Sequence, residues 1–236
     1  MNDQQPYRLP PGFLRLQSWL SPAFPIGSYG YSHGLEWAVD AQQIDDRRSL
    51  VDWLEADLRY GSGWNEAIFF NEAWHCTFND DRARLFETAE LAAACRGTCE
   101  FALESSQQGT ASLVMLRQVW PDRVLDWLAQ ILCERRVQPV AGVVLGVGLA
   151  RQGIPARLAL SAFLQSYVAN LVTAGVRLIP LGQTDGQLAI AELEAAVLAT
   201  TAQATKSTLA DVGSAAIMVE LASMAHETQY TRLFRS

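Results

Sequence analysis

Lysine is nearly absent from this chain of 236 residues. Lys206 is the single lysine among 18 basic residues, so arginine supplies the other permanent positive charges. A Walker-type phosphate-binding loop needs a lysine directly after a glycine, and no glycine lies near Lys206. A Schiff-base enzyme would have to use the same lysine. The sequence therefore argues against both classes of chemistry.

Charge of either sign is also scarce. Charged residues make up 18% of the chain, against about 25% in an ordinary globular protein, and the net charge is −7. No basic stripe runs along the sequence, which argues against a nucleic-acid partner. A low charged fraction indicates that part of the outer surface is covered, so we expect an oligomer or a stable protein partner.

Typical metal-binding and disulfide patterns are missing. The chain has few residues of the relevant types: Cys76, Cys95, Cys99, Cys133, His33, His75 and His226. Cys95 and Cys99 have the spacing of one helix face, but a zinc site needs two further ligands, and we expect both to be small core residues. We expect no metal site and no cofactor. A stand-alone metal-binding protein that uses these two cysteines and a histidine stays open as an alternative.

Long hydrophobic runs are absent as well. The longest, Pro139–Ala150, is too short to span a bilayer. The N-terminus is polar and has no apolar leader, so we expect a cytoplasmic protein with reduced thiols. Residues 1–7 and 225–236 are expected to be flexible tails.

What the sequence does contain is helical periodicity without a convincing pair of strands. Apolar residues recur at helical spacing after Pro155, and again from Asp46 to Tyr60, where Gly61 suits the C-cap. Val140–Arg151 is apolar nearly all round, and its glycines would let a neighbouring helix approach closely. Further helices are expected at about 8–20, 31–41, 65–76, 80–94, 98–120, 122–135, 184–204 and 211–224. We expect one all-α domain over residues 1–236, a bundle of roughly nine or ten helices.

The most unusual segment is Ser21–Trp37, in which prolines, glycines and aromatic residues alternate. Proline fixes φ and glycine permits positive φ, so the backbone of this loop has a defined shape. Such a loop commonly presents a surface to a partner. The candidate partner-binding residues here are Tyr29, Tyr31, His33 and Glu36.

Two further segments carry directed polar groups. Arg177–Gln187 joins two helices, and Thr184-x-x-Gln187 has the form of a capping box. The C-terminus combines aromatic residues with arginine, as interface hot spots do. The candidate partner-binding residues in these segments are Arg177, Gln183, Asp185, Gln187, His226, Glu227, Tyr230, Arg232, Leu233, Phe234 and Arg235.

Residues of the same loop also allow a catalytic interpretation. His33 could act with Ser28 or Ser32 in an all-α hydrolase, with Glu36 orienting the imidazole. Neighbouring residues such as Ser32 and His33 rarely form the required hydrogen bond, and no nucleophile elbow is present. We therefore expect no catalytic residue and no enzyme, with the hydrolase kept as an alternative.

Together, three segments resemble the UreF family of urease accessory proteins. They are Ser21–Trp37, Ala174–Gln187 and His226–Ser236, and Glu104–Gly109 is a weaker match. The resemblance extends over nearly the whole chain in the same order, although the stretch from about Asn79 to Val137 adds little.

Membership of that family implies a non-enzymatic chaperone. Its members are all-helical, form homodimers, bind the accessory protein UreD (also called UreH) and engage the GTPase UreG. The assembly acts on apo-urease so that its nickel site can be loaded. By this resemblance the C-terminal residues would dock on UreD, and the Tyr29–Glu36 region would lie near the GTPase-facing or dimer surface.

Overall fold

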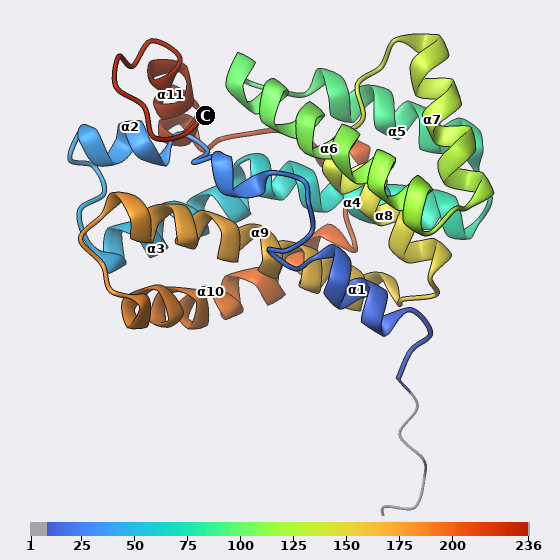
Figure 1. The fold of residues 1–236 in the computed structure, drawn as a ribbon, viewed down its shortest axis with the longest axis horizontal. Coiled ribbons are helices and arrows are strands. Elements are labelled where there is room, and N and C mark those ends of the chain that lie inside the picture. The colour runs from blue at the N-terminus through green and yellow to red at the C-terminus, as the bar shows by residue number, and fades with distance from the viewer. Residues whose placement is uncertain (1–8, 236) are drawn as a thin grey trace, which may run out of the picture.

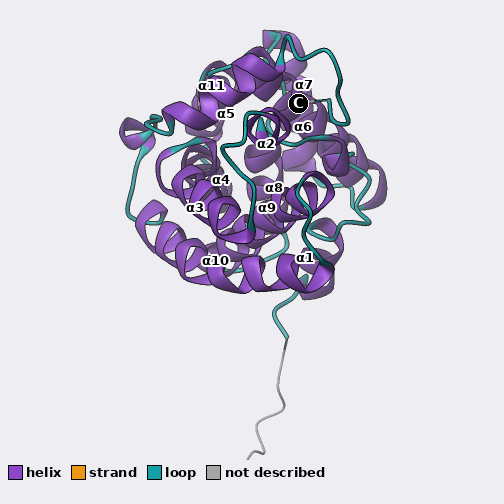
Figure 2. Cartoon of the chain, turned by 90° about the vertical axis from the view of Figure 1, so that its left-hand side faces the viewer, coloured by secondary structure: helices purple, strands orange, loops and turns teal. Residues whose placement is uncertain are grey.

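The computed structural model describes residues 9–235, which form helices joined by short loops (Figure 1). Within that range lie eleven α-helices, two short 3-10 helices and no strand. The α-helices are α1 (Phe13–Trp19), α2 (Leu35–Asp40), α3 (Arg47–Tyr60), α4 (Ser62–Phe78), α5 (Arg82–Ala94), α6 (Cys99–Val119), α7 (Arg123–Arg135), α8 (Ala141–Arg151), α9 (Ala156–Leu178), α10 (Gln183–Ala204) and α11 (Ile217–His226). Figure 2 shows the same all-helical composition from the side.

The expected all-α class is confirmed, but nine or ten helices is too few for the described part of the chain. The count is higher because short helices such as α1 and α2 are separated from their neighbours by turns and are not continuous with them. Gly34 precedes α2 with φ of 80°, a conformation in which glycine carries no steric penalty. The expected N-terminal tail, residues 1–7, lies outside the described residues.

Helix α3 follows its sequence pattern closely. The Asp46 side chain accepts a hydrogen bond of 2.8 Å from the Ser49 backbone N–H, which satisfies one free donor of the first turn. The buried face includes Leu50, Leu54 and Leu58 at helical spacing. Gly61 follows as the C-cap, as expected.

The core is built around α4, which is buried on nearly all sides and contacts α3, α5, α8, α9 and α10. Its closest partner is α8, the apolar glycine-containing helix. A Cβ at Gly146 would lie 2.6 Å from the Phe70 carbonyl oxygen, so only glycine allows the two backbones to approach this closely. This confirms the expectation from the glycines of 140–151.

Helix α10 begins differently from the sequence expectation. The first helical residue is Gln183, and the Asp185 carboxylate accepts a hydrogen bond of 3.2 Å from the Gly182 N–H. The capping box expected from Thr184 and Gln187 is wrong, because the cap lies two residues earlier, at Gly182 and Asp185.

The last helix, α11, packs on α2 and α6. Beyond it the chain turns back, and the Arg235 N–H donates a hydrogen bond of 2.8 Å to the Gly30 carbonyl. In Figure 1 this return path lies beside α2. The packing of residues 226–235 differs from the flexible tail expected from residue 225, because several buried contacts hold them. We call residues 226–235 the C-terminal segment.

Candidate functional site

The three sequence segments meet on one side of the molecule. Arg177, in the last turn of α9, donates a hydrogen bond of 2.8 Å from Nη1 to the Tyr29 carbonyl. Its guanidinium also lies 4.3 Å from the ring centre of Phe234, a cation–π contact. A single arginine thus joins the glycine-containing loop to the C-terminal segment.

Between these segments lies an open surface groove of about 460 Å³. Five of the predicted partner-binding residues line it: Tyr29, Tyr31, Arg177, Leu233 and Arg235. Gln107 of α6, within the weaker match Glu104–Gly109, forms part of the same wall. Tyr29 and Leu233 are 78% and 58% exposed, which leaves two large apolar side chains open to a partner.

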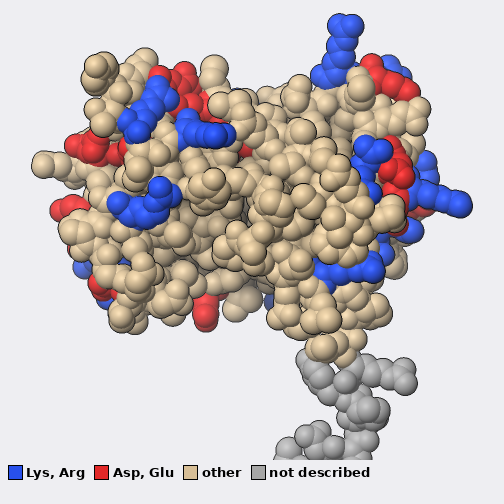
Figure 3. Space-filling model, in the orientation of Figure 1, with Lys and Arg blue, Asp and Glu red and all other residues tan. Residues whose placement is uncertain are grey.

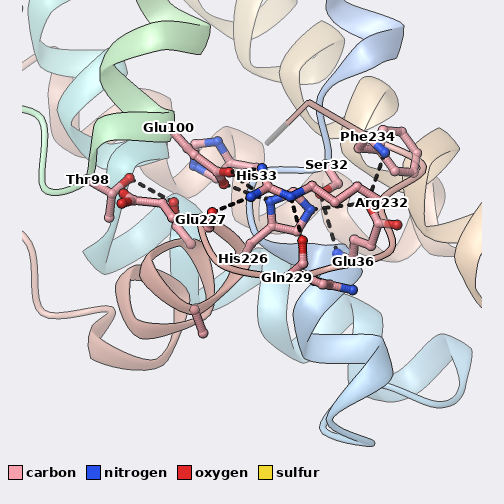
Figure 4. A network of polar contacts seen from close by, with 12 residues as sticks. Ser32, His33, Glu36, Thr98, Glu100, His226, Glu227, Gln229, Arg232 and Phe234 are labelled. Atoms are coloured by element: carbon pink, nitrogen blue, oxygen red, sulfur yellow. Dashed lines mark hydrogen bonds and ion pairs between the residues drawn. The ribbon is translucent and has the colours of Figure 1, made fainter.

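Glu36 anchors the C-terminal segment through hydrogen bonds. This carboxylate, on the first turn of α2, is buried and accepts hydrogen bonds from the Leu233 and Phe234 backbone N–H groups, the latter at 2.9 Å. It also lies 3.1 Å from Nε2 of His226 (Figure 4). The segment is therefore anchored on one acidic side chain that is far away in sequence.

Glu100 completes this polar network from α6. Its carboxylate lies 2.8 Å from Nδ1 of His226 and 3.0 Å from Nη1 of Arg232. Burial raises the pKa of Glu100, and the neighbouring His226 and Arg232 oppose that rise. Sequence reasoning missed Glu100, since a lone glutamate on an amphipathic helix gives no signal of its partners.

Several predicted partner-binding residues are buried rather than exposed: Tyr31, His33, Glu36, His226 and Phe234. In this fold they hold the loop and the C-terminal segment in place instead of facing a partner. Glu227 is half-buried and accepts a hydrogen bond of 3.0 Å from the Cys99 N–H, while Tyr230 is fully exposed.

The remaining predicted residues lie elsewhere. Gln183 and Gln187 are exposed in the first turns of α10, and neither lines the groove. Asp185 caps α10 and lies 3.5 Å from Nη1 of Arg47 on α3. Their contacts are those of a helix start, so the structure does not bring them to the groove.

His33 is the centre of a second buried network. It has φ of 58°, rare for a residue with a side chain, and its ring stacks on Phe101 at 3.9 Å. Nδ1 lies 3.0 Å from a Glu104 carboxylate oxygen, and Nε2 lies 3.2 Å from the Tyr167 hydroxyl. Burial by itself lowers the pKa of His33, but the carboxylates of Glu104, Asp57 and Glu66 outweigh it, and the pKa is raised.

This second network does not have the proton arrangement of a hydrolase. The serine hydroxyl in contact with His33 Nε2 is that of Ser62, and it donates its proton to Asp57 at 2.9 Å. Tyr167 donates to the other Asp57 oxygen at 2.6 Å. A serine nucleophile must give its proton to the imidazole, whereas the Ser62 proton is directed to Asp57. The sequence did not predict Ser62, although a charged Asp57 on the apolar face of α3 was an available signal.

The two cysteines considered for a metal site lie on different helices. Cys95 is the C-cap of α5 and Cys99 is the first residue of α6, so they do not share a helix face. Cys95 is half-buried and Cys99 is exposed, and the expectation that both are core residues is wrong. Among residues 9–235, no three histidine, cysteine or acidic side chains are grouped as metal ligands.

Comparisons with known proteins identify the family of this chain. The family model for UreF matches residues 44–194. The "Urease accessory protein UreF" of Bradyrhizobium sp. (strain BTAi1 / ATCC BAA-1182) is 47% identical over 226 residues, which are 96% of this chain and 92% of that protein. The proteins of the same name from Rhodopseudomonas palustris (strain BisB5) and Granulibacter bethesdensis are 44% and 46% identical, each over 94% of this chain and at least 90% of its own length. The chain belongs to the UreF family, whose named members are accessory proteins of urease and not enzymes.

Proposed function

We propose that this chain is a scaffold for urease maturation that dimerises, binds UreD (UreH) and recruits the GTPase UreG to apo-urease, so that nickel can be inserted. It acts in the cytoplasm and needs no cofactor or catalytic residue of its own. Nickel is the cargo of the assembly in this proposal.

The observation that carries the proposal is the outer face of α11. Its buried face consists of Val219, Ala222, Ser223 and His226. All four exposed residues of this helix are large and apolar: Ile217 (65%), Met218 (47%), Leu221 (48%) and Met224 (46%). A contiguous exposed apolar face on a short helix is typical of a protein interaction site, and methionine adapts well to a partner surface.

We assign this face, with the adjoining C-terminal segment, to UreD. The groove beside it supplies exposed Tyr29 and Leu233 together with Arg177 and Arg235. Aromatic residues and arginine suit a partner that offers carboxylates. We assign the part of the groove formed by the loop around Tyr29 to the GTPase-facing side of the assembly, while Leu233 and Arg235 belong to the surface assigned to UreD.

A separate surface is assigned to the second copy in the dimer. In Figure 3 the charged side chains lie mainly toward the two ends of the molecule, and the middle of this face carries few. Helix α6 crosses it and exposes Leu103, Gln107, Thr110 and Val114. Two copies related by a two-fold axis can meet on an uncharged face without placing like charges together.

Deletion of residues 233–236 tests the UreD assignment. It removes Phe234 from beneath Arg177 and two N–H donors from Glu36. We expect capture of purified UreD to be lost while helicity measured by circular dichroism is kept. Full-strength capture by the shortened chain would show that the C-terminal segment is not part of the docking surface.

A further inference from the structure

A partly open cavity of about 90 Å³, with both apolar and polar lining residues, lies beside His33, and Ile26 lines both this cavity and the surface groove. It is bounded by α4, α6, α8 and α9 and by the end of α1. Its volume is enough for several water molecules or for one ligand of a few heavy atoms.

Three polar atoms on the lining residues are buried and have no hydrogen-bond partner. They are Nε1 of Trp19, Nη2 of Arg96 and Oγ of Ser105. Two of these are N–H donors, and the third can donate or accept. A buried donor without a partner costs free energy. The cavity therefore favours an occupant that offers oxygen acceptors.

Two ion pairs lie in the wall of the cavity, and the carboxylate-bearing Glu220 of α11 also lines it. Arg96, whose side chain is 7% exposed, lies 2.6 Å from a Glu66 carboxylate oxygen. The second Glu66 oxygen accepts a hydrogen bond of 3.1 Å from the Gly142 N–H. His33 lies 3.0 Å from Glu104 in the same wall. The carboxylates of this wall would repel an anion, and Arg96 and His33 are each already paired with one of them, which favours a neutral occupant over an anionic one.

The rest of the lining is mixed. Leu20, Ile26, Leu145 and Phe163 offer apolar contacts, and the side-chain amides of Asn65, Gln108 and Asn170 offer both donors and acceptors. This combination suits a small molecule that has a carbonyl oxygen, N–H donors and an apolar end.

We propose that this cavity is a binding site for a small neutral amide, whose carbonyl oxygen accepts a hydrogen bond from Arg96 Nη2. Its N–H groups face the acceptors of the wall, and its apolar end lies against the aliphatic side chains. The inference does not depend on the proposed function, because none of the exposed side chains assigned to a partner lines the cavity, although Ile26 lines both the cavity and the groove.

Acetamide and acetate form a matched pair of probes, since they have the same shape and differ in charge. The intact chain is titrated with each in ligand-observed NMR, and crystals are soaked in acetamide. We expect saturable binding of acetamide, no detectable binding of acetate, and acetamide density beside Arg96 and Ser105. Water alone in the cavity, or equal binding of the two probes, would overturn the proposal.

Two neighbouring serines provide the mutational control. Ser105→Ala removes an unpartnered hydroxyl from the cavity wall and should weaken acetamide binding about fivefold. Ser106→Ala removes a hydroxyl that donates to the Leu103 carbonyl at 3.0 Å outside the cavity, and binding should not change. Equal loss in both variants, or no loss in either, would contradict the placement of the ligand.

Discussion

The α4–α8 contact and the C-terminal segment are held together by different physical means. In the first, Gly146 lets two helices approach until a Cβ would meet the Phe70 carbonyl. In the second, the carboxylates of Glu36 and Glu100 hold His226, Arg232 and two backbone N–H groups. The first contact therefore depends on side-chain volume, and the second depends on charge and hydrogen bonding. We therefore expect that the helix core and the C-terminal segment can be perturbed separately.

The largest effect is expected from overpacking the helix contact. Gly146→Leu forces α4 and α8 apart, because the new Cβ would lie 2.6 Å from a backbone oxygen that cannot move alone. We expect a loss of about 3 kcal/mol in the free energy of unfolding, measured by chemical denaturation. Gly213→Ala is the control, since nothing lies within 4 Å of its added methyl group. Similar losses in both variants would contradict the volume argument.

A smaller and more local effect is expected at the C-terminal segment. Glu36→Gln removes the charge of the carboxylate that accepts from Leu233 and Phe234 and faces His226. We expect faster hydrogen exchange in residues 226–235 and a loss of about 2 kcal/mol, with the helices of the core unchanged. Glu194→Gln, on the exposed face of α10, should have no such effect. Uniformly faster exchange across the core would show that the two regions are not separable.

The smallest effect is expected in the pH dependence of the free energy of unfolding, and we expect it to arise from His33. Its pKa is raised above the ordinary value of 6.5, so its stabilising contribution is complete below about pH 6.5 and is lost as pH rises through the folded-state pKa. We expect His33→Asn, which tolerates the left-handed backbone, to flatten the stability profile above pH 6.5. His75→Asn, at an exposed position on α4, should leave the slope as it is. An unchanged slope in the His33 variant would contradict this assignment.

The sequence was sufficient to predict the helical class and most of the helices, because apolar periodicity and glycine are local signals. Helix α3 and the apolar helix α8 illustrate this. It also singled out the loop, Arg177 and the C-terminal segment, which the structure brings together.

What could not be predicted is which polar residues pair with each other. His226 and Glu36 were placed at a partner surface, whereas both are buried and bonded to one another. Glu100 and Tyr167 gave no local signal, since their partners lie on other helices. Such pairs depend on tertiary distances that no sequence spacing encodes.

The central claim is that the exposed apolar face of α11 is a docking surface for UreD. The direct measurement is the affinity of purified UreD for the Leu221→Glu, Met224→Glu double variant. Both residues are exposed, so the free energy of unfolding should change by no more than about 0.5 kcal/mol. Leu198→Glu, at a position 56% exposed on α10, is the matched control. The account predicts that the double variant loses UreD binding while the control keeps it; unchanged binding by the double variant would contradict the claim.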